Sequence, residues 1–175
     1  MLSEVMERSG RADAGRLGDL YRAHADGAVR LAYLLTGDRA LAEDLVQDAF
    51  VRLAGRLVHL RDQQAFEAYL RRTVVNLSNS YFRRRKVERA FMESARGSLD
   101  PQSVQRAPSM DDREDLWRAL GRLTARQRAA VVLRFYEDLP ERTVAEILKC
   151  QPGTVKSLVA RGLEKLRSDI RGEDR

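Results

Sequence analysis

Apolar residues recur at helical intervals along most of this chain, and the clearest case lies near the C-terminus. A helical segment over 139–148 is followed by a short break at 149–153 and by a second helical segment that ends near Arg167. One face of the second segment is apolar and consists of Val155, Leu158, Val159, Leu163, Leu166 and Ile170. This pattern predicts two helices packed through one buried stripe, in the form of a helix-turn-helix.

Four residues at the start of the second segment lie outside that stripe, namely Lys156, Ser157, Ala160 and Arg161. If the stripe packs on the preceding helix, these side chains point outward from the first turns, where a recognition helix contacts base edges in the major groove. A plain helical hairpin with a solvated basic face would show the same periodicity. The pattern therefore predicts binding of duplex DNA, with a purely structural hairpin as the alternative.

A first long helix is predicted to end at Gly37, because glycine is a frequent C-terminal stop. Its apolar stripe consists of Leu17, Leu20, Tyr21, His24, Ala28, Leu31 and Leu35. No carboxylate–histidine arrangement surrounds His24, so we interpret it as a packed core residue and not as a ligand or base.

Asp38 is placed to cap a second helix. The apolar stripe of that helix consists of Leu41, Leu45, Ala49, Phe50, Leu53 and Leu57, and its opposite face carries Glu43, Asp44, Gln47, Asp48 and Arg52. The opposite face is acidic over two turns, although the chain as a whole carries a net positive charge. Such a face suits docking on a positively charged protein surface, or it simply stays solvated.

A third helix is predicted to begin around Asp62 and to lead into an aromatic and basic segment. Its apolar positions are Phe66, Tyr69, Leu70, Thr73, Val74 and Leu77, and they are followed by Tyr81, Phe82, the cations of 83–86, and Arg89, with Arg71 and Arg72 upstream. Rings beside cations suit single-stranded nucleic acid, because cations neutralise phosphate while rings or amides hold unstacked bases. A basic helix end that faces water is the alternative.

Hydrophobic periodicity disappears between Glu93 and Arg113, where glycine, proline and small polar residues predict a linker. Helical order resumes with Leu116, Trp117, Leu120 and Leu123, and then with Val131, Val132, Phe135 and Tyr136. Thr124 and Gln127 have the spacing of a capping box before the latter group. We predict an all-α protein with two small helical domains, 15–92 and 113–172, joined by a flexible linker at 93–112, the second domain ending in the helix-turn-helix.

Composition narrows the function classes. The net charge of +6 over 175 residues favours a polyanionic partner without requiring one. Cys150 is the single cysteine, so no intramolecular disulfide or cysteine-cluster metal site is expected, and we interpret it as structural. Residues 1–14 are charged and lack a signal-peptide core, and no stretch approaches the length of a membrane span. We expect a soluble, cytoplasmic protein with no membrane insertion.

Three blocks of sequence, in this order along the chain, resemble one known family. They are Ala42-Glu43-Asp44-Leu45-Val46-Gln47-Asp48-Ala49-Phe50, the stretch from Tyr69-Leu70 through Asn76 to Arg83-Arg84-Arg85, and Gly153-Thr154-Val155-Lys156-Ser157. Together they resemble the extracytoplasmic-function (ECF) type of bacterial RNA polymerase sigma factors, particularly the actinobacterial SigE-like group. Two residues depart from the family pattern: Tyr69, where tryptophan is common, and Lys149, where a glycine usually ends the first helix of the helix-turn-helix.

The resemblance implies a two-domain transcription initiation factor that is not an enzyme and needs no cofactor of its own. The first domain would dock on core RNA polymerase and capture the opened minus-10 strand, while the second would read the minus-35 duplex. The implied partners are core RNA polymerase, through the clamp helices of its largest subunit and its flap, and promoter DNA in single-stranded and duplex form. An anti-sigma factor is a further candidate partner.

The resemblance also assigns roles to individual residues. Polymerase binding is implied for Asp44, Gln47 and Asp48. Binding of minus-10 DNA is implied for Asn76, Asn79, Ser80, Arg83 and Arg84, with Ser78 beside them. Binding of minus-35 DNA is implied for Thr154, Lys156, Ser157, Ala160 and Arg161.

Two other classes compete with this interpretation. A stand-alone helix-turn-helix regulator that binds an operator without polymerase explains the C-terminal half, but it leaves the acidic second helix and the basic third helix without a role. An adaptor that only sequesters partners predicts no sequence-specific DNA contact. An enzyme has little support, because the sequence shows no phosphate-binding glycine loop, metal cluster or nucleophile–base set.

Overall fold

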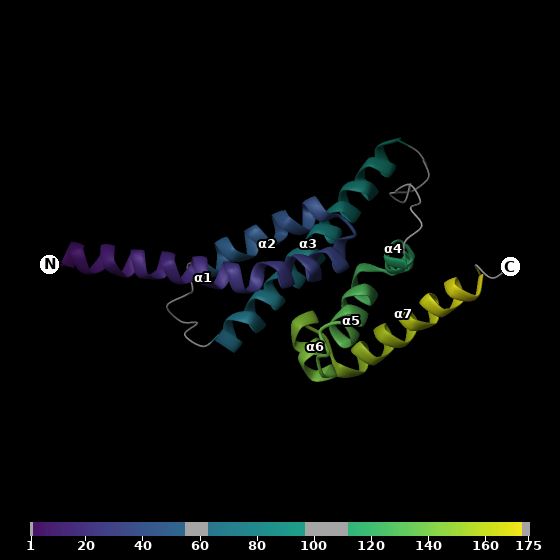
Figure 1. Cartoon of the computed structure of the whole chain (residues 1–175). Coiled ribbons are helices and arrows are strands. Elements are labelled where there is room, and N and C mark those ends of the chain that lie inside the picture. Colours follow the sequence, from purple (N-terminus) through teal and green to yellow (C-terminus); the bar gives the residue numbers. More distant parts are fainter. Residues whose placement is uncertain (1, 55–62, 97–111, 173–175) are drawn as a thin grey trace. The chain divides into compact units, whose positions relative to one another are not determined.

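The structure of the protein, a computed structural model, describes residues 2–54, 63–96 and 112–172. These ranges form seven helices and contain no strand (Figure 1). The helices are α1 (Leu2–Thr36), α2 (Arg39–Ala54), α3 (Gln63–Arg96), α4 (Asp112–Arg122), α5 (Ala125–Phe135), α6 (Glu141–Leu148) and α7 (Pro152–Gly172). The prediction of an all-α fold is confirmed.

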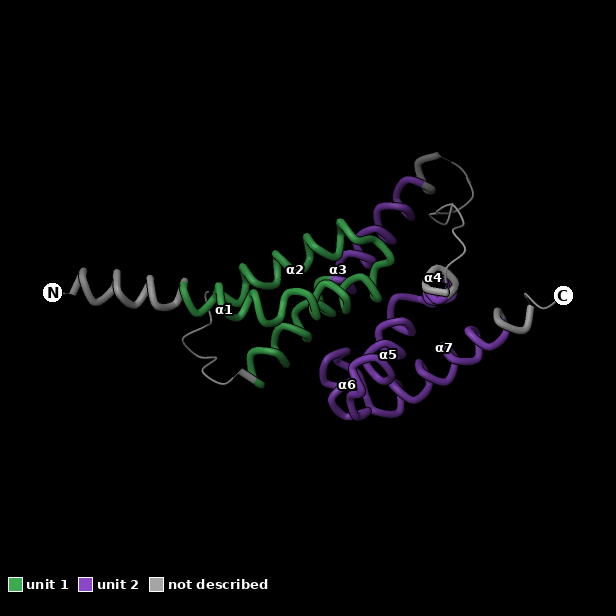
Figure 2. Tube along the Cα trace, in the orientation of Figure 1, with its two compact units in different colours: residues 1–77 green, residues 78–175 purple. Residues whose placement is uncertain are grey.

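The chain separates into two compact units, residues 1–77 and 78–175, and the boundary falls inside α3 (Figure 2). Helix α3 is unbroken to Arg96 and therefore covers the first residues of the expected linker. Residues 97–111 lie outside the described ranges, and α4 begins at Asp112. The division into domains at 15–92 and 113–172 stays a prediction.

Local signals at the junction of α1 and α2 act as the sequence predicts. Gly37 adopts φ = 72°, a left-handed conformation that glycine enters without steric cost, and its N–H donates to the carbonyl of Tyr33 over 2.8 Å. One residue later, the Asp38 carboxylate accepts a hydrogen bond of 3.1 Å from the N–H of Leu41. The chain therefore leaves one helix and caps the next within two residues, and α1 packs closely against α2.

An aromatic cluster joins the three helices of the first unit. The ring of Phe66 in α3 lies 5.9 Å from that of Phe50 in α2 and 5.6 Å from the imidazole of His24 in α1, measured between centroids. Phe66 is fully buried, and Phe50 also meets Tyr21 edge-on. The interpretation of His24 as a packed residue is confirmed. Leu57, expected at the end of the second stripe, lies outside the described residues.

In the second unit, α5 packs against both α6 and α7. Its start is fixed by the predicted capping box, because the Gln127 N–H donates to the Thr124 hydroxyl over 3.3 Å and the Thr124 N–H donates to the Gln127 side chain over 3.0 Å. Val131 and Val132 are buried, whereas Phe135 and Tyr136 at the end of the helix are exposed.

Arginines of α5 hold the ends of neighbouring helices. Arg128 is buried and donates to the carbonyls of Gly121 and Leu123 at the end of α4, over 3.4 and 3.3 Å. Burial lowers the pKa of the Arg128 guanidinium from its usual value. Arg126 donates to the Leu148 carbonyl that ends α6, and Arg134 donates to the Leu139 carbonyl that precedes it. These contacts satisfy carbonyls that helix ends and turns leave without partners.

In the turn of the helix-turn-helix, Lys149 adopts the left-handed backbone conformation that glycine usually adopts there. Lys149 has φ = 51° and ψ = 55°, and the N–H of Cys150 donates to the Ala145 carbonyl over 3.0 Å. This is the helix ending that glycine usually provides, so lysine costs about 1 kcal/mol relative to glycine here. Helix α7 then starts at Pro152, whose fixed φ suits the first helical position.

The contact between α5 and α7 depends on a glycine. Val155 and Gly162 are buried on α7, while Leu158, Val159, Leu163 and Leu166 are half-buried and the side chain of Ile170 is outside the described set. A Cβ built on Gly162 would lie 2.8 Å from Cγ2 of Val131, closer than real side chains approach. The predicted stripe therefore packs, and its closest approach occurs at a residue without a side chain.

We expect Gly162→Ala to lower the free energy of unfolding by about 1–3 kcal/mol, because the added methyl group overpacks a contact with a stiff β-branched side chain. Thermal denaturation of the full chain measures this. Gly121→Ala in α4 is the matched control, since an added Cβ meets nothing within 4 Å there, and alanine improves helix propensity by up to about 1 kcal/mol. Equal melting temperatures for the two variants would contradict the packing argument.

Candidate nucleic-acid interface

The start of α7 presents its polar side chains to solvent. Val155 is fully buried, so the rotation of the helix about its own axis is set at this turn. The side chains expected to bind minus-35 DNA are all exposed: Thr154, Lys156, Ser157, Ala160 and Arg161. Their expected outward orientation is confirmed, and they occupy the part of a recognition helix that reaches base edges.

Two of these side chains have partners within the protein. The Ser157 hydroxyl donates to the Gly153 carbonyl over 2.7 Å. Lys156 Nζ lies 3.8 Å from Oε2 of Glu141 in the first turn of α6. Both members of this ion pair are substantially exposed, so it contributes little to stability. It does, however, place a carboxylate beside a candidate DNA-contacting cation, which sequence reasoning did not predict.

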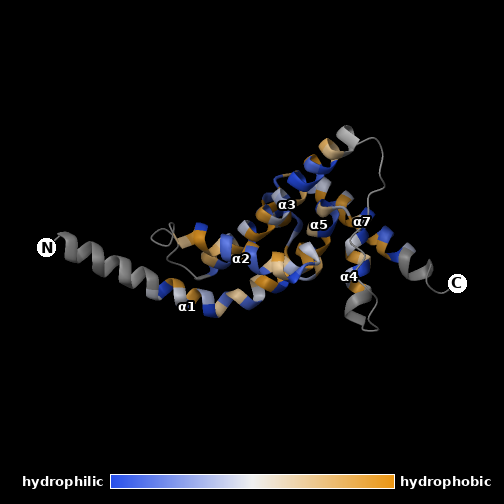
Figure 3. Cartoon of the chain, turned by 90° about the horizontal axis from the view of Figure 1, so that it is seen from above, coloured by the Kyte–Doolittle hydropathy of each residue, from blue (hydrophilic) through white to orange (hydrophobic). Residues whose placement is uncertain are grey.

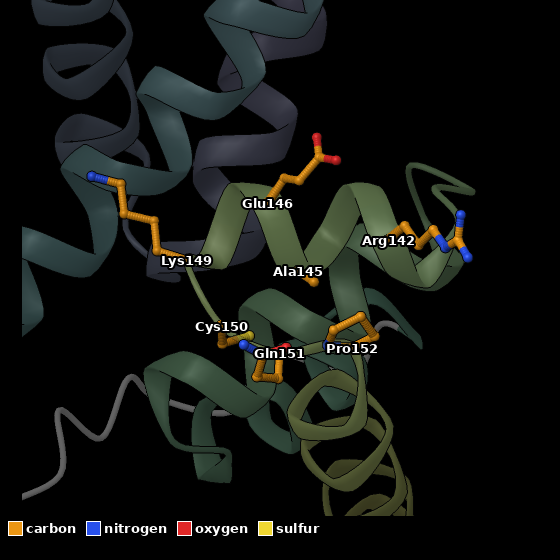
Figure 4. Close-up of a pocket in the computed structure, with 7 residues that line it drawn as sticks. All are labelled: Arg142, Ala145, Glu146, Lys149, Cys150, Gln151 and Pro152. Carbon is orange, nitrogen blue, oxygen red and sulfur yellow. The ribbon is translucent and has the colours of Figure 1, made fainter.

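A shallow groove of about 640 Å³ lies between α6 and the start of α7. It is lined by Arg142, Ala145, Glu146, Lys149, Cys150, Gln151 and Pro152 (Figure 4). The long side chains of Arg142 and Lys149 extend from opposite ends of α6, whereas Ala145 and Pro152 line the middle. Its lining combines the charged side chains of Arg142, Glu146 and Lys149 with Ala145, Pro152 and the free thiol of Cys150.

Helix α3 carries the residues expected to bind minus-10 DNA. Arg83 and Arg84 are exposed, while Asn76, Asn79 and Ser80 are half-buried. Ser78 is only 2% exposed, and its assignment beside the captured base stays a prediction. It follows Phe66, Leu70 and Val74 at four-residue steps and therefore belongs to the row that faces the core.

One face of α3 carries three of the residues expected to bind minus-10 DNA and one further arginine. Arg72, Asn76, Asn79 and Arg83 follow at intervals of four, three and four residues, so they share one face of the unbroken helix. Arg84 lies about 100° further around the helix axis. Arg72 is exposed and extends the amide and guanidinium row by one turn towards the N-terminus. Arg72 is among the cations that the sequence pattern already places beside the predicted single-strand surface.

Arg85 is used differently from its two neighbours. Its guanidinium donates to the Tyr81 hydroxyl over 3.1 Å and lies 5.7 Å from the centre of the same ring. Tyr81 in turn packs edge-on against Phe82. Tyr81, one of the aromatic residues beside the basic run, therefore contacts Arg85 within the same helix.

The acidic face of α2 also lies outward, as expected. Asp44, Gln47 and Asp48 are exposed, and Glu43 is paired with Arg39 over 3.0 Å. Val51 is 74% exposed and lies seven, four and three residues after the three docking candidates, so it shares their face. Val51 therefore adds an apolar side chain to an otherwise charged and polar face. The charge pattern of the sequence does not single out Val51, because valine is uncharged.

Comparison with known proteins decides the family. Residues 20–88 match the model of sigma-70 region 2, and residues 113–166 match that of sigma-70 region 4. The chain is 36% identical over 154 residues to the RNA polymerase sigma-E factor of Streptomyces avermitilis, covering 87% of this chain and 84% of that relative. The chain belongs to the RNA polymerase sigma factors. Within them it is of the extracytoplasmic-function type.

Two further relatives extend the comparison over nearly the whole sigma factor. The ECF RNA polymerase sigma factor SigW of Bacillus subtilis is 25% identical and covers 98% of this chain and 97% of its own length. The sigma factor RpoE of Bartonella quintana, solved with the anti-sigma factor NepR, superposes with a TM-score of 0.67 at 27% identity over 86% of this chain and 94% of that chain.

Family membership gives the protein its general role. A sigma factor is a transcription initiation factor that directs RNA polymerase to promoters, and it is not an enzyme. The region 2 match contains the outward faces of α2 and α3 as far as residue 88, and the region 4 match contains the helix-turn-helix. None of the described helices combines the length and apolarity needed to cross a bilayer.

Proposed function

We propose that this sigma factor divides promoter recognition among three outward helix faces, one for polymerase, one for the minus-10 strand and one for the minus-35 duplex. The observation that carries this proposal is that each of these helices has a buried stripe and that the candidate side chains lie outside it, exposed on α2 and α7 and exposed or half-buried on α3. A stand-alone operator-binding regulator would need only the third face.

The α2 face is the docking surface for core polymerase, consisting of Asp44, Gln47, Asp48 and Val51. Clustered carboxylates steer the encounter with a positively charged partner, and the exposed valine supplies apolar contact once the surfaces meet. The clamp helices of the largest polymerase subunit are the partner that the family resemblance indicates. The polymerase flap is the corresponding candidate partner of the C-terminal domain.

The α3 face captures the opened minus-10 strand. The amides of Asn76 and Asn79, together with Ser80, provide donors and acceptors for the edge of an unpaired base, while Arg83 and Arg84 neutralise phosphates. Holding an extruded base offsets the few kcal/mol that unpairing and unstacking cost. Recognition of the sequence and opening of the duplex thereby become one step.

The start of α7 reads the minus-35 duplex. Arg161 and Lys156 can contact guanine edges or phosphates, Ser157 and Thr154 offer hydroxyls, and Ala160 leaves room for a thymine methyl group. Glu141 limits the freedom of Lys156 through their ion pair. Base discrimination at this helix therefore depends on two cations: Arg161, and Lys156, which is paired with Glu141.

The remaining assignments follow from these partners. We place the protein in the cytoplasm, because core RNA polymerase and promoter DNA are there. The two recognition functions belong to domains 15–92 and 113–172, with 93–112 as the flexible linker between them. Because RpoE of Bartonella quintana was solved with an anti-sigma factor, we include an inhibitor of this kind among the partners of the present chain.

Transcription by a reconstituted holoenzyme tests the proposal as a whole. The full chain is added to bacterial core polymerase that lacks sigma factors, with genomic DNA of the source organism as template, and the 5′ ends of the transcripts are sequenced. Start sites that share two upstream elements are expected. Duplex binding by the free chain without any polymerase association would support the stand-alone regulator instead.

We expect the double substitution Asp44→Arg with Asp48→Arg to weaken core-polymerase binding by about 100-fold or more, because it replaces attraction by like-charge repulsion. Both residues are exposed, so the melting temperature should hardly change. Co-purification with core polymerase measures the loss. Asp19→Arg with Asp26→Arg is the matched control, since it alters the charge equally at exposed positions of α1. Undiminished binding of the α2 variant would remove the docking assignment.

We expect Asn76→Ala to reduce promoter opening about tenfold or more while leaving duplex binding by the holoenzyme nearly unchanged, because a captured base exists only after opening. Permanganate reactivity of promoter thymines reports opening, and a mobility shift on closed duplex reports binding. Gln64→Ala removes an exposed amide from the first turn of the same helix and serves as control. A parallel loss in both assays would argue against base capture by Asn76.

We expect Arg161→Ala to weaken binding of the minus-35 duplex by about 1–3 kcal/mol at fixed salt, since the side chain contacts a base edge or a phosphate. Fluorescence anisotropy with a duplex taken from the mapped promoters measures the change. The control is Arg167→Ala, which removes an exposed arginine beyond the recognition turns of the same helix. If both variants bind equally well, Arg161 is not a contact.

A further inference from the structure

The second half of α3 continues past its last buried residue as a solvent-exposed helix. Ser78 is the last buried position, and every residue from Arg83 to Met92 is exposed. Most of this stretch is hydrophilic (Figure 3). Val87, Phe91 and Met92 are nevertheless 64%, 76% and 61% exposed. Exposure of several large apolar side chains on one polar helix indicates contact with a partner. Phe91 lies beyond the region 2 match, which ends at residue 88.

Two of these three apolar residues extend a row that carries Ser80 and Arg84 and lies beside the face of Asn76, Asn79 and Arg83. Ser80, Arg84, Val87 and Phe91 follow at intervals of four, three and four residues, so they form one row along the helix. At 1.5 Å per residue, the row extends about 16 Å beyond Ser80. Met92 points about 100° away from Phe91 and lies outside the row. Phe91 thus ends the row of which Ser80 and Arg84 are proposed minus-10 contacts.

Charge identifies the kind of partner that this row fits. The exposed stretch carries Arg83, Arg84, Arg85, Lys86 and Arg89 against a single carboxylate, Glu88. A partner surface must therefore be anionic and must also offer flat apolar faces. Nucleic acid has both, because phosphates alternate with base rings on which an aromatic side chain stacks or between which it wedges.

We propose that Val87 and Phe91 contact promoter DNA as an apolar continuation of the minus-10 surface, about five nucleotide steps beyond the bases held near Ser80. The inference rests on the proposed function of α3. The proposed contact lies on the upstream side of the minus-10 element, the side on which the minus-35 element also lies. Val87 and Phe91 add affinity where the captured single strand rejoins the duplex, and the arginines neutralise the phosphates beside them.

Phe91→Ala compared with Met92→Ala tests the proposal, because both variants truncate an exposed apolar side chain and the two residues are adjacent. The probe is forked promoter DNA from the mapped start sites, with the minus-10 strand unpaired and with upstream duplex of decreasing length, bound to full-length sigma factor in holoenzyme. Phe91→Ala is expected to lower affinity about tenfold on the long fork, whereas Met92→Ala changes it less than twofold. Phe91→Trp, which keeps an aromatic face, is expected to retain binding.

Forks of different lengths separate capture of the minus-10 strand by Asn76 from the additional contact made by Phe91. On a minus-10 single strand alone, the Phe91→Ala holoenzyme should bind like the wild type, while Asn76→Ala should bind weakly. If Asn76→Ala has no effect there, the proposed capture function fails. If Asn76 matters but Phe91→Ala equals Met92→Ala on every fork, the inference alone is overturned. Weakened association of Phe91→Ala with core polymerase, with unchanged DNA affinity of the assembled holoenzyme, would assign Phe91 to a protein contact and overturn it too.

Discussion

Burial of one stripe on each helix is the constraint on which the functional surfaces of this sigma factor depend. A helix has a single rotation about its axis, so fixing one face fixes the direction of every other side chain. Complete burial of Val155 turns Lys156 and Arg161 outward, and the buried row through Phe66 and Val74 leaves Asn76 half-buried beside it. Core packing and recognition are therefore two consequences of the same helical period.

Arginine performs opposite tasks in this protein, and its surroundings decide which. Arg128 is buried against the carbonyl end of α4, where desolvation disfavours its charge and carbonyl oxygens compensate. Arg83 and Arg161 are exposed on helix faces that carry no core contacts, and their charge is available to phosphate. The basic composition thus includes both structural braces and candidate DNA ligands, which is why net charge alone is a weak guide to function.

The recognition helix is held by a few contacts that tolerate little change. Gly162 allows α7 to approach Val131, while Lys149 keeps a left-handed turn at some cost in stability. Arg126 and Arg134 hold the carbonyls at the two ends of α6. Together these contacts determine where the first turn of α7 lies relative to the rest of its unit, and hence which side chains that turn exposes.

The sequence by itself determined the helical class, the order of the helices and most of their ends. These properties depend on neighbours within four residues: the apolar period, Gly37 with Asp38, and the capping box of Thr124 with Gln127. The outward faces of α2 and α7 followed from the same period. Motif spacing, however, did not indicate that Ser78 is buried or that Val51 is exposed beside the acidic face of α2.

Only the tertiary structure decided which arginines donate hydrogen bonds to the carbonyls of neighbouring helices and how closely α5 approaches α7. It also decided that Lys156 lies beside Glu141 and how much of α3 extends beyond the packed core. Each of these depends on groups that are distant in the sequence or on the end of a packing surface. Local periodicity shows which residues share a face, but whether a neighbour covers that face is settled only when the chain folds back on itself.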